Sequence, residues 1–148
     1  WCARRHHHRR NSQAGAFNMS DHSSSSNYLV AAAALSALIG VAVGGYGAHG
    51  LNANESLTSM WETGVTYQIW HALGAFAASW LASTREAHTR KIVTAGGWCL
   101  VLGSLSFSGS LYFFIIDSIF PFPMLAPIGG TVMMLGWGGI VYGALRRR

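Results

Sequence analysis

The sequence predicts an all-α integral membrane bundle of four transmembrane helices. Hydrophobic residues make up 51% of the 148-residue chain and charged residues only 10%, against about 25% charged residues in soluble domains. The charges are also clustered, so that residues 28–48, 92–116 and 127–145 contain no Asp, Glu, Lys or Arg. A run of about 20 apolar residues lets a helix cross the hydrocarbon layer of a bilayer. The chain is therefore expected to bury most of its surface in lipid.

Residues 1–27 are predicted to form a disordered leader outside the bundle. Residues 1–18 are rich in arginine and poor in acids, and Met19 precedes a plausible start. Two interpretations of residues 1–18 stay open: the remnant of an organellar transit segment, or non-native upstream sequence. The triplet His6-His7-His8 lies in an arginine-flanked tail, which lacks the packed surroundings of a metal site. We therefore expect no metal and no other cofactor.

Four predicted spans make up the membrane domain (28–148), and they cover about residues 28–47, 57–83, 92–116 and 127–145. Before the second span, Asn54 is a suitable N-cap and Glu55 suits the positive end of the helix dipole. Pro127 fits the first turn of the fourth span, because the amide that proline lacks has no partner there. The connection before it contains Pro121 and Pro123 and is too interrupted to continue a helix.

Basic residues predict the orientation of the bundle. The loop between the second and third spans contains Arg85, Arg90 and Lys91, and the chain ends in three arginines, whereas the other two loops contain no Lys or Arg. Both termini are therefore expected on the cytoplasmic-type side of a plasma or bacterial inner membrane. A mitochondrial inner membrane is the alternative. Three aromatic residues are expected near the opposite interface: Tyr46, Trp61 and Tyr112.

Small residues recur at helical spacing and predict close contacts between the spans. The packing positions are Gly40 and Gly44 in the first span, Gly103, Ser106 and Ser110 in the third, and Gly136, Gly139 and Gly143 in the fourth. The third span carries a second small-residue face with Gly97, Ser104 and Ser108. A helix with two such faces is expected to have two close neighbours, which indicates a compact bundle.

The second span carries polar residues among small ones. Tyr67 and His71 are four residues apart and Gln68 and His71 three, so the three share one helix face and each of these pairs can touch. Polar groups at membrane depth are costly and mark functional sites by default. The plainer alternative, which we favour, is that they hydrogen-bond neighbouring helices and hold the bundle together. The opposite face is predicted to face lipid, and it carries Val65, Ile69, Leu73, Phe76 and Trp80.

Two further ionisable residues complete the candidate intramembrane polar cluster. Glu62 is expected near the outer interface, where reaching up to the lipid headgroups is favoured over a protein partner. His49 follows the flexible pair Gly47 and Ala48 and can approach Glu62 across a short loop. The alternative is that His49 only ends the first helix at the water line. Because histidine changes its charge near neutral pH, such a cluster would suit a proton relay.

A series of short motifs runs from about Val41 to the C-terminus in the order of a known family. They are Gly47-Ala48-His49-Gly50-Leu51, Trp61-Glu62-Thr63-Gly64-Val65, Tyr67-Gln68, His71-Ala72-Leu73, Phe107-Ser108-Gly109-Ser110-Leu111-Tyr112, Ala126-Pro127-Ile128-Gly129-Gly130 and Leu135-Gly136-Trp137. They resemble the YgdD-like small multipass membrane proteins (domain of unknown function four-two-three), which have animal transmembrane-protein homologues. The resemblance implies a multipass inner-membrane protein of uncharacterised function and supplies no catalytic residues. The leader before Met19 and the hydrophobic connection 119–125 depart from the family pattern.

These features predict a non-enzymatic structural or accessory component of the lipid bilayer, as a homo-oligomer or within a larger membrane complex. The alternative is an oligomeric conductor of protons or small solutes that uses Tyr67, Gln68 and His71. An enzyme is not expected, because the chain shows no paired acids, metal constellation or phosphate-binding loop. A nucleic-acid partner is not expected either, because no folded basic face with interleaved aromatics is visible.

Overall fold

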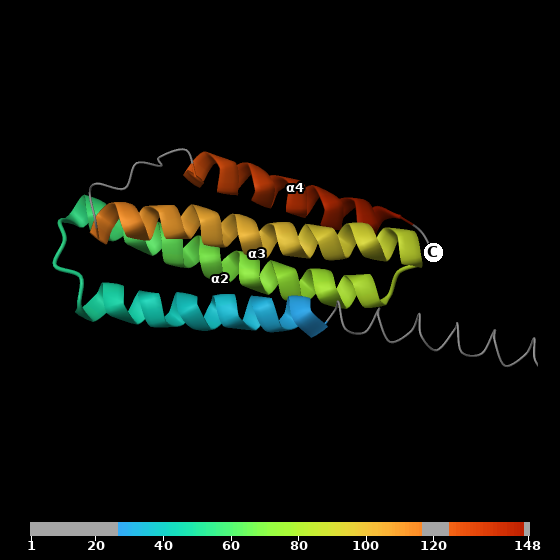
Figure 1. Cartoon of the computed structure of the whole chain (residues 1–148), viewed down its shortest axis with the longest axis horizontal. Coiled ribbons are helices and arrows are strands. Elements are labelled where there is room, and N and C mark those ends of the chain that lie inside the picture. The colour runs from blue at the N-terminus through green and yellow to red at the C-terminus, as the bar shows by residue number, and fades with distance from the viewer. Residues whose placement is uncertain (1–26, 117–124, 147–148) are drawn as a thin grey trace, which may run out of the picture.

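The computed structural model describes residues 27–116 and 125–146 (Figure 1). These residues form the N-terminal helix Asn27–His49, α2 Glu55–Ser83, α3 Ala87–Ile116 and α4 Leu125–Leu145. They contain no strand, so the all-α prediction is confirmed for this part of the chain. Residues 1–26 of the predicted leader, the connection 117–124 and the last two arginines lie outside the described residues.

The ends of α2 follow from local side chains. The Oδ1 of Asn54 accepts a hydrogen bond from the amide of Leu57 at 3.0 Å, so the predicted N-cap is confirmed. Glu55 lies in the first turn of α2, beside the positive end of the helix dipole. At the other end the amide of Thr84 bonds the last carbonyl groups of α2, and α3 begins at Ala87. The short connection sets α2 and α3 antiparallel.

The helices lie lengthwise beside one another, with the N-terminal helix next to α2 and α4 next to α3 (Figure 1). Leu29 and Ala33 of the N-terminal helix also pack in one core cluster with Ala75 of α2 and Val101 of α3. α4 approaches α2 mainly through Trp137, whose ring would lie 2.9 Å from a Cβ added at Gly74. The core therefore runs along both sides of α3.

Glycines set the contact between α3 and α4. A Cβ on Gly96 would lie 2.8 Å from the carbonyl oxygen of Gly136, and a Cβ on Gly136 would lie 2.8 Å from that of Gly96. Gly103 and Gly129 repeat this reciprocal arrangement, at 2.9 and 2.6 Å, after a seven-residue step along each helix. Only glycine leaves room for two backbones this close. A seven-residue period keeps the contact on one seam when two helices coil around each other with a left-handed twist.

The opposite face of α3 meets the N-terminal helix and α2. A Cβ on Gly97 would lie 2.7 Å from Cδ2 of Leu29 and 3.1 Å from the Cβ of Ala78. Further along, the Ser108 hydroxyl donates to the carbonyl oxygen of Gly64 in α2 at 2.7 Å. α3 therefore has close neighbours on both of its small-residue faces.

Three of the described helices are long and apolar enough to cross a membrane by length and composition. They are the N-terminal helix, α3 and α4. α2 is not among them; its residues 63–83 carry no charge, but they include the polar side chains of Tyr67, Gln68 and His71, which lower the hydropathy of the helix. It is nevertheless 29 residues long, which corresponds to about 43 Å of helix.

Candidate functional site

Gln68 is a polar side chain in the middle of α2 that is only 1% exposed. Its Nε2 donates to the carbonyl oxygen of Ser36 in the N-terminal helix at 2.9 Å. Its Oε1 accepts from the hydroxyl of Tyr112 in α3 at 3.1 Å. Burying an amide group without hydrogen-bond partners is costly. The two hydrogen bonds of Gln68 therefore favour the observed arrangement of α2 with the N-terminal helix and α3. We call these residues (Ser36, Gln68, Tyr112) the Gln68 clasp.

An aromatic cluster lies beside the Gln68 clasp. Trp61 is buried, and its ring centroid lies 5.7 Å from that of Tyr46 and 4.8 Å from that of Tyr112. The indole Nε1 donates to the carbonyl oxygen of Val43 at 3.1 Å. A Cβ on Gly47 would lie 2.5 Å from the indole, so glycine at this position makes room for the ring. The three aromatic residues predicted near one interface thus join the same three helices.

Tyr67 and His71 lie on a different side of α2 from the partners of Gln68. Their rings stack at 5.6 Å, and Nδ1 of His71 lies 2.7 Å from the Tyr67 carbonyl oxygen. Because a carbonyl oxygen only accepts, we assign the proton to Nδ1. Tyr67 also stacks on Phe107 of α3 at 4.8 Å, and His71 meets Trp137 of α4 edge-on at 6.2 Å.

The structure does not bring the five predicted polar residues into one cluster. Gln68 points to the N-terminal helix and α3, whereas Tyr67 and His71 form an aromatic group with α3 and α4. Glu62 and His49 are both exposed, and no ion pair joins them within the described residues. Three residues along a helix amount to about 300° of rotation. This leaves Gln68 and His71 about 60° apart, enough for them to meet different neighbours.

The predicted lipid-facing stripe of α2 is wrong for three of its residues. Phe76 packs against the core cluster of Leu29 and Val101, and Val65 and Ile69 are half-buried against the N-terminal helix. A Cβ on Gly44 would lie 3.2 Å from Cγ1 of Val65, and a Cβ on Gly40 would lie 3.0 Å from Cγ1 of Ile69. The glycines of the N-terminal helix let it approach this apolar face closely, so protein takes the place predicted for lipid.

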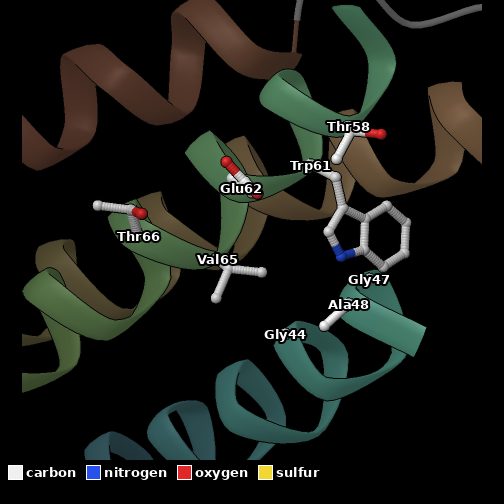
Figure 2. A pocket seen from close by; sticks show the side chains of 8 residues that line it. All are labelled: Gly44, Gly47, Ala48, Thr58, Trp61, Glu62, Val65 and Thr66. Atoms are coloured by element: carbon white, nitrogen blue, oxygen red, sulfur yellow. The ribbon is translucent and has the colours of Figure 1, made fainter. Parts of the chain in front are cut away.

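A pocket of about 330 Å³ opens between the end of the N-terminal helix and the first half of α2. The N-terminal helix contributes Gly44, Gly47 and Ala48, and α2 contributes Thr58, Trp61, Glu62, Val65 and Thr66. Figure 2 shows Trp61 and Val65 pointing toward the N-terminal helix, whereas Glu62 and Thr66 project from another side of α2. We call this the Glu62 pocket.

Sequence reasoning missed the Glu62 pocket, because a pocket depends on how two helices approach each other. One signal was present: two of the motifs shared with the YgdD-like family, around Gly47 and around Trp61, both contribute to its walls. The pocket offers one carboxylate, two hydroxyls and apolar walls. No group of three His, Cys, Asp or Glu side chains that could hold a metal is found in the described ranges.

At the opposite end of the bundle, the loop after α2 is joined to the end of α4. Arg85 donates from Nη1 to the carbonyl oxygen of Arg146 at 3.1 Å and from Nη2 to that of Ala144 at 3.3 Å. The last carbonyl groups of a helix have no partner within it and carry its negative dipole end. The guanidinium group supplies both hydrogen bonds and positive charge there.

Comparison with known proteins gives a consistent set of relatives. A family model described as "Protein of unknown function (DUF423)" matches residues 43–130. The UPF0382 membrane protein YwdK of Bacillus subtilis is 36% identical over 115 residues, which cover 76% of this chain and 92% of the relative. The UPF0382 inner membrane protein YgdD of Escherichia coli is 32% identical over 127 residues, which cover 82% of this chain and 92% of the relative. No solved structure matches the chain significantly.

Proposed function

The chain belongs to the DUF423 family of membrane proteins of unknown function, and we propose that it is a non-enzymatic structural or accessory component of the membrane. It packs against lipid and assembles as a homo-oligomer or within a larger membrane complex. The Gln68 clasp carries this proposal. The buried polar group of α2 uses both its donor and its acceptor to hold helices together, as polar residues inside membrane bundles commonly do.

We extend the proposal to the membrane topology, in which α2 is a fourth span. Its length of about 43 Å fits the 40–45 Å of a whole bilayer with its headgroups, and it lies alongside the three apolar helices (Figure 1). Its exposed side chains include Trp70, Leu73 and Trp80, which suit contact with lipid. Gln68 is turned toward other helices instead.

Both termini are proposed to lie on the cytoplasmic-type side of a plasma or bacterial inner membrane. Arg85, Arg90 and Lys91 follow α2, and positive loops favour that side. The bonds from Arg85 to the end of α4 support a common side for this loop and the C-terminus. The Escherichia coli relative is named an inner membrane protein, which supports this membrane over the mitochondrial alternative.

Cysteine labelling tests this topology. In intact cells, an impermeant thiol reagent is expected to label Asn52→Cys, in the loop before α2, and to leave Ser83→Cys unlabelled until the membrane is opened. Both positions are exposed, so access depends on the side of the membrane. The unsubstituted chain, with Cys2 and Cys99, measures the background. Labelling of Ser83→Cys from outside intact cells would contradict the orientation.

The alternative function is an oligomeric conductor of protons or small solutes. One observation favours it: His71 is only half-buried, beside Tyr67, on a face of α2 that α4 approaches mainly through Trp137. Two properties of the site oppose it. Nδ1 of His71 is engaged by a carbonyl group of its own helix, and a relay across about 30 Å of hydrocarbon needs several titratable groups or a file of water.

Proton flux into liposomes distinguishes the two functions. We expect reconstituted wild-type protein to give no more flux than empty vesicles, and His71→Gln to behave as wild type. The measurement uses a pH-sensitive dye inside the vesicles and detergents that preserve oligomers. Flux above the empty-vesicle level that His71→Gln abolishes, while the variant keeps its thermal stability, would contradict the structural role and establish the conductor.

A further inference from the structure

The carboxyl group of Glu62 has no basic partner among the residues that the structure describes. Residues 28–84 contain no Lys or Arg. The basic residues of the described ranges are Arg85, Arg90, Lys91 and Arg146, which all lie beyond the opposite end of α2. His49 is exposed and does not line the pocket. Within the described residues, therefore, no lysine or arginine is placed to pair with Glu62, and an external cation can take that position.

If α2 spans the bilayer, the position of Glu62 along the helix gives its depth in the membrane. The inference therefore rests on the proposed topology. Glu62 lies seven residues after the start of α2, which is about 10 Å along the helix. A helix of about 43 Å extends about 7 Å beyond a 30 Å hydrocarbon core at each end. Glu62 thus lies near the boundary between headgroups and acyl chains. A carboxylate there favours a cation, because partial desolvation strengthens their attraction.

Oxygen-bearing side chains form a row along the Glu62 pocket. Thr58, Glu62 and Thr66 are spaced four residues apart, so they follow one stripe of α2. The Thr58 hydroxyl donates its proton to the carbonyl oxygen of Asn54 at 3.1 Å, which leaves it only lone pairs to offer a ligand. An ionised carboxylate also only accepts hydrogen bonds. The row therefore suits a ligand that donates several hydrogen bonds and carries positive charge.

The walls of the pocket indicate what such a cation is attached to. Gly44 and Gly47 let Val65 and Trp61 pack closely against the N-terminal helix, and together with Ala48 these residues give the pocket an apolar lining. We propose that the Glu62 pocket binds the primary ammonium group of an amphiphile, with the carboxylate of Glu62 paired to the ammonium and the apolar part lying along this apolar lining. Ethanolamine phospholipid and free alkylamine are the two sources of this chemistry.

Competition between two lipids tests the proposal. The full chain is placed in nanodiscs with equal amounts of phosphatidylethanolamine and phosphatidylcholine, and the lipids retained on it are counted by native mass spectrometry. The choline headgroup has the same positive charge but no N–H donor. A preference for the ethanolamine lipid therefore measures the contribution of the hydrogen bonds that its ammonium group donates. We expect about fivefold retention of the ethanolamine lipid over the choline lipid, which corresponds to the net contribution of about one hydrogen bond from the ammonium group. In a second arm, dodecylamine competes for the site.

Three variants make the test specific. Glu62→Gln removes the charge and Ala48→Leu fills the pocket without changing charge, and both are expected to reduce the lipid ratio to about one. Glu55→Gln makes the same chemical change on α2 outside the pocket and is expected to retain the wild-type ratio. If Glu62→Gln does not fold, the lipid ratio of Ala48→Leu alone shows whether the preference depends on the Glu62 pocket.

The outcomes separate the lipid source, the amine source and failure. Binding of dodecylamine without any lipid preference, lost in Glu62→Gln, supports the ammonium site with a free amine as its ligand. A ratio near one together with no saturable amine binding would overturn the proposal, as would a lipid preference that both pocket variants retain. Because topology is measured separately by cysteine labelling, failure here with a correct topology leaves the structural role standing.

Discussion

A single methyl group added at Gly136 is expected to lower the free energy of unfolding by about 1–3 kcal/mol, the usual cost of overpacking a filled interior. Its Cβ would lie 2.8 Å from the carbonyl oxygen of Gly96, and backbone cannot turn away as a side chain can. At Gly138 a Cβ would meet nothing within 4 Å, and at Gly139 its nearest neighbour would be at 3.4 Å. Gly138→Ala and Gly139→Ala are therefore expected to be tolerated.

The comparison among these three variants isolates the helix contact. Each replaces glycine by alanine inside α4, so each gains the same intrinsic helix propensity of about 1 kcal/mol. Unfolding in mixed micelles, followed by circular dichroism during titration with dodecyl sulfate, gives the three free energies. Equal stability of Gly136→Ala and Gly138→Ala would show that the reciprocal glycine contact between α3 and α4 is absent from the folded protein.

Replacing Gln68 by leucine is expected to cost about 1–3 kcal/mol, because two interhelical hydrogen bonds of about 0.6–1.7 kcal/mol each are lost. A double-mutant cycle with Tyr112→Phe tests the clasp directly. Since Tyr112 donates to Oε1 of Gln68, the two changes remove one shared bond. The coupling free energy is expected to be about 0.6–1.7 kcal/mol.

Tyr28 provides the matched control for this cycle. It is an exposed tyrosine near the start of the N-terminal helix, so Tyr28→Phe makes the same chemical change away from the clasp. Tyr28→Phe and Gln68→Leu are expected to be additive within about 0.5 kcal/mol. A Tyr112 coupling no larger than this control would mean that Gln68 does not join α3 to the N-terminal helix.

The sequence predicted the helices well, because chain geometry and bilayer thickness restrict the choices. Uncharged runs located three apolar helices, and Asn54 located the start of α2 to within two residues. The prediction failed at Val65, Ile69 and Phe76, because lipid tails are as apolar as a packed helix. An apolar face in a membrane protein therefore does not reveal whether lipid or protein covers it.

The candidate site was predicted less completely for a related reason. Helical periodicity placed Tyr67, Gln68 and His71 on one face, but it does not give the rotation of α2 against its neighbours. That rotation decides that Gln68 meets Ser36 and Tyr112 while His71 meets Trp137. The Glu62 pocket depends in addition on the approach of the two helices, set by glycines of the N-terminal helix, which periodicity alone leaves open.

Arg85 has a consequence for how the sequence of this chain can vary. Its guanidinium group bonds main-chain carbonyl oxygens at positions 144 and 146, not side chains. Every amino acid supplies the same carbonyl group, so selection on this contact acts on one partner only. A change of side chain at 144 or 146 is therefore expected to leave both bonds in place. A change of Arg85 to lysine is expected to lose them, because lysine lacks the planar fork that reaches two carbonyl groups at once.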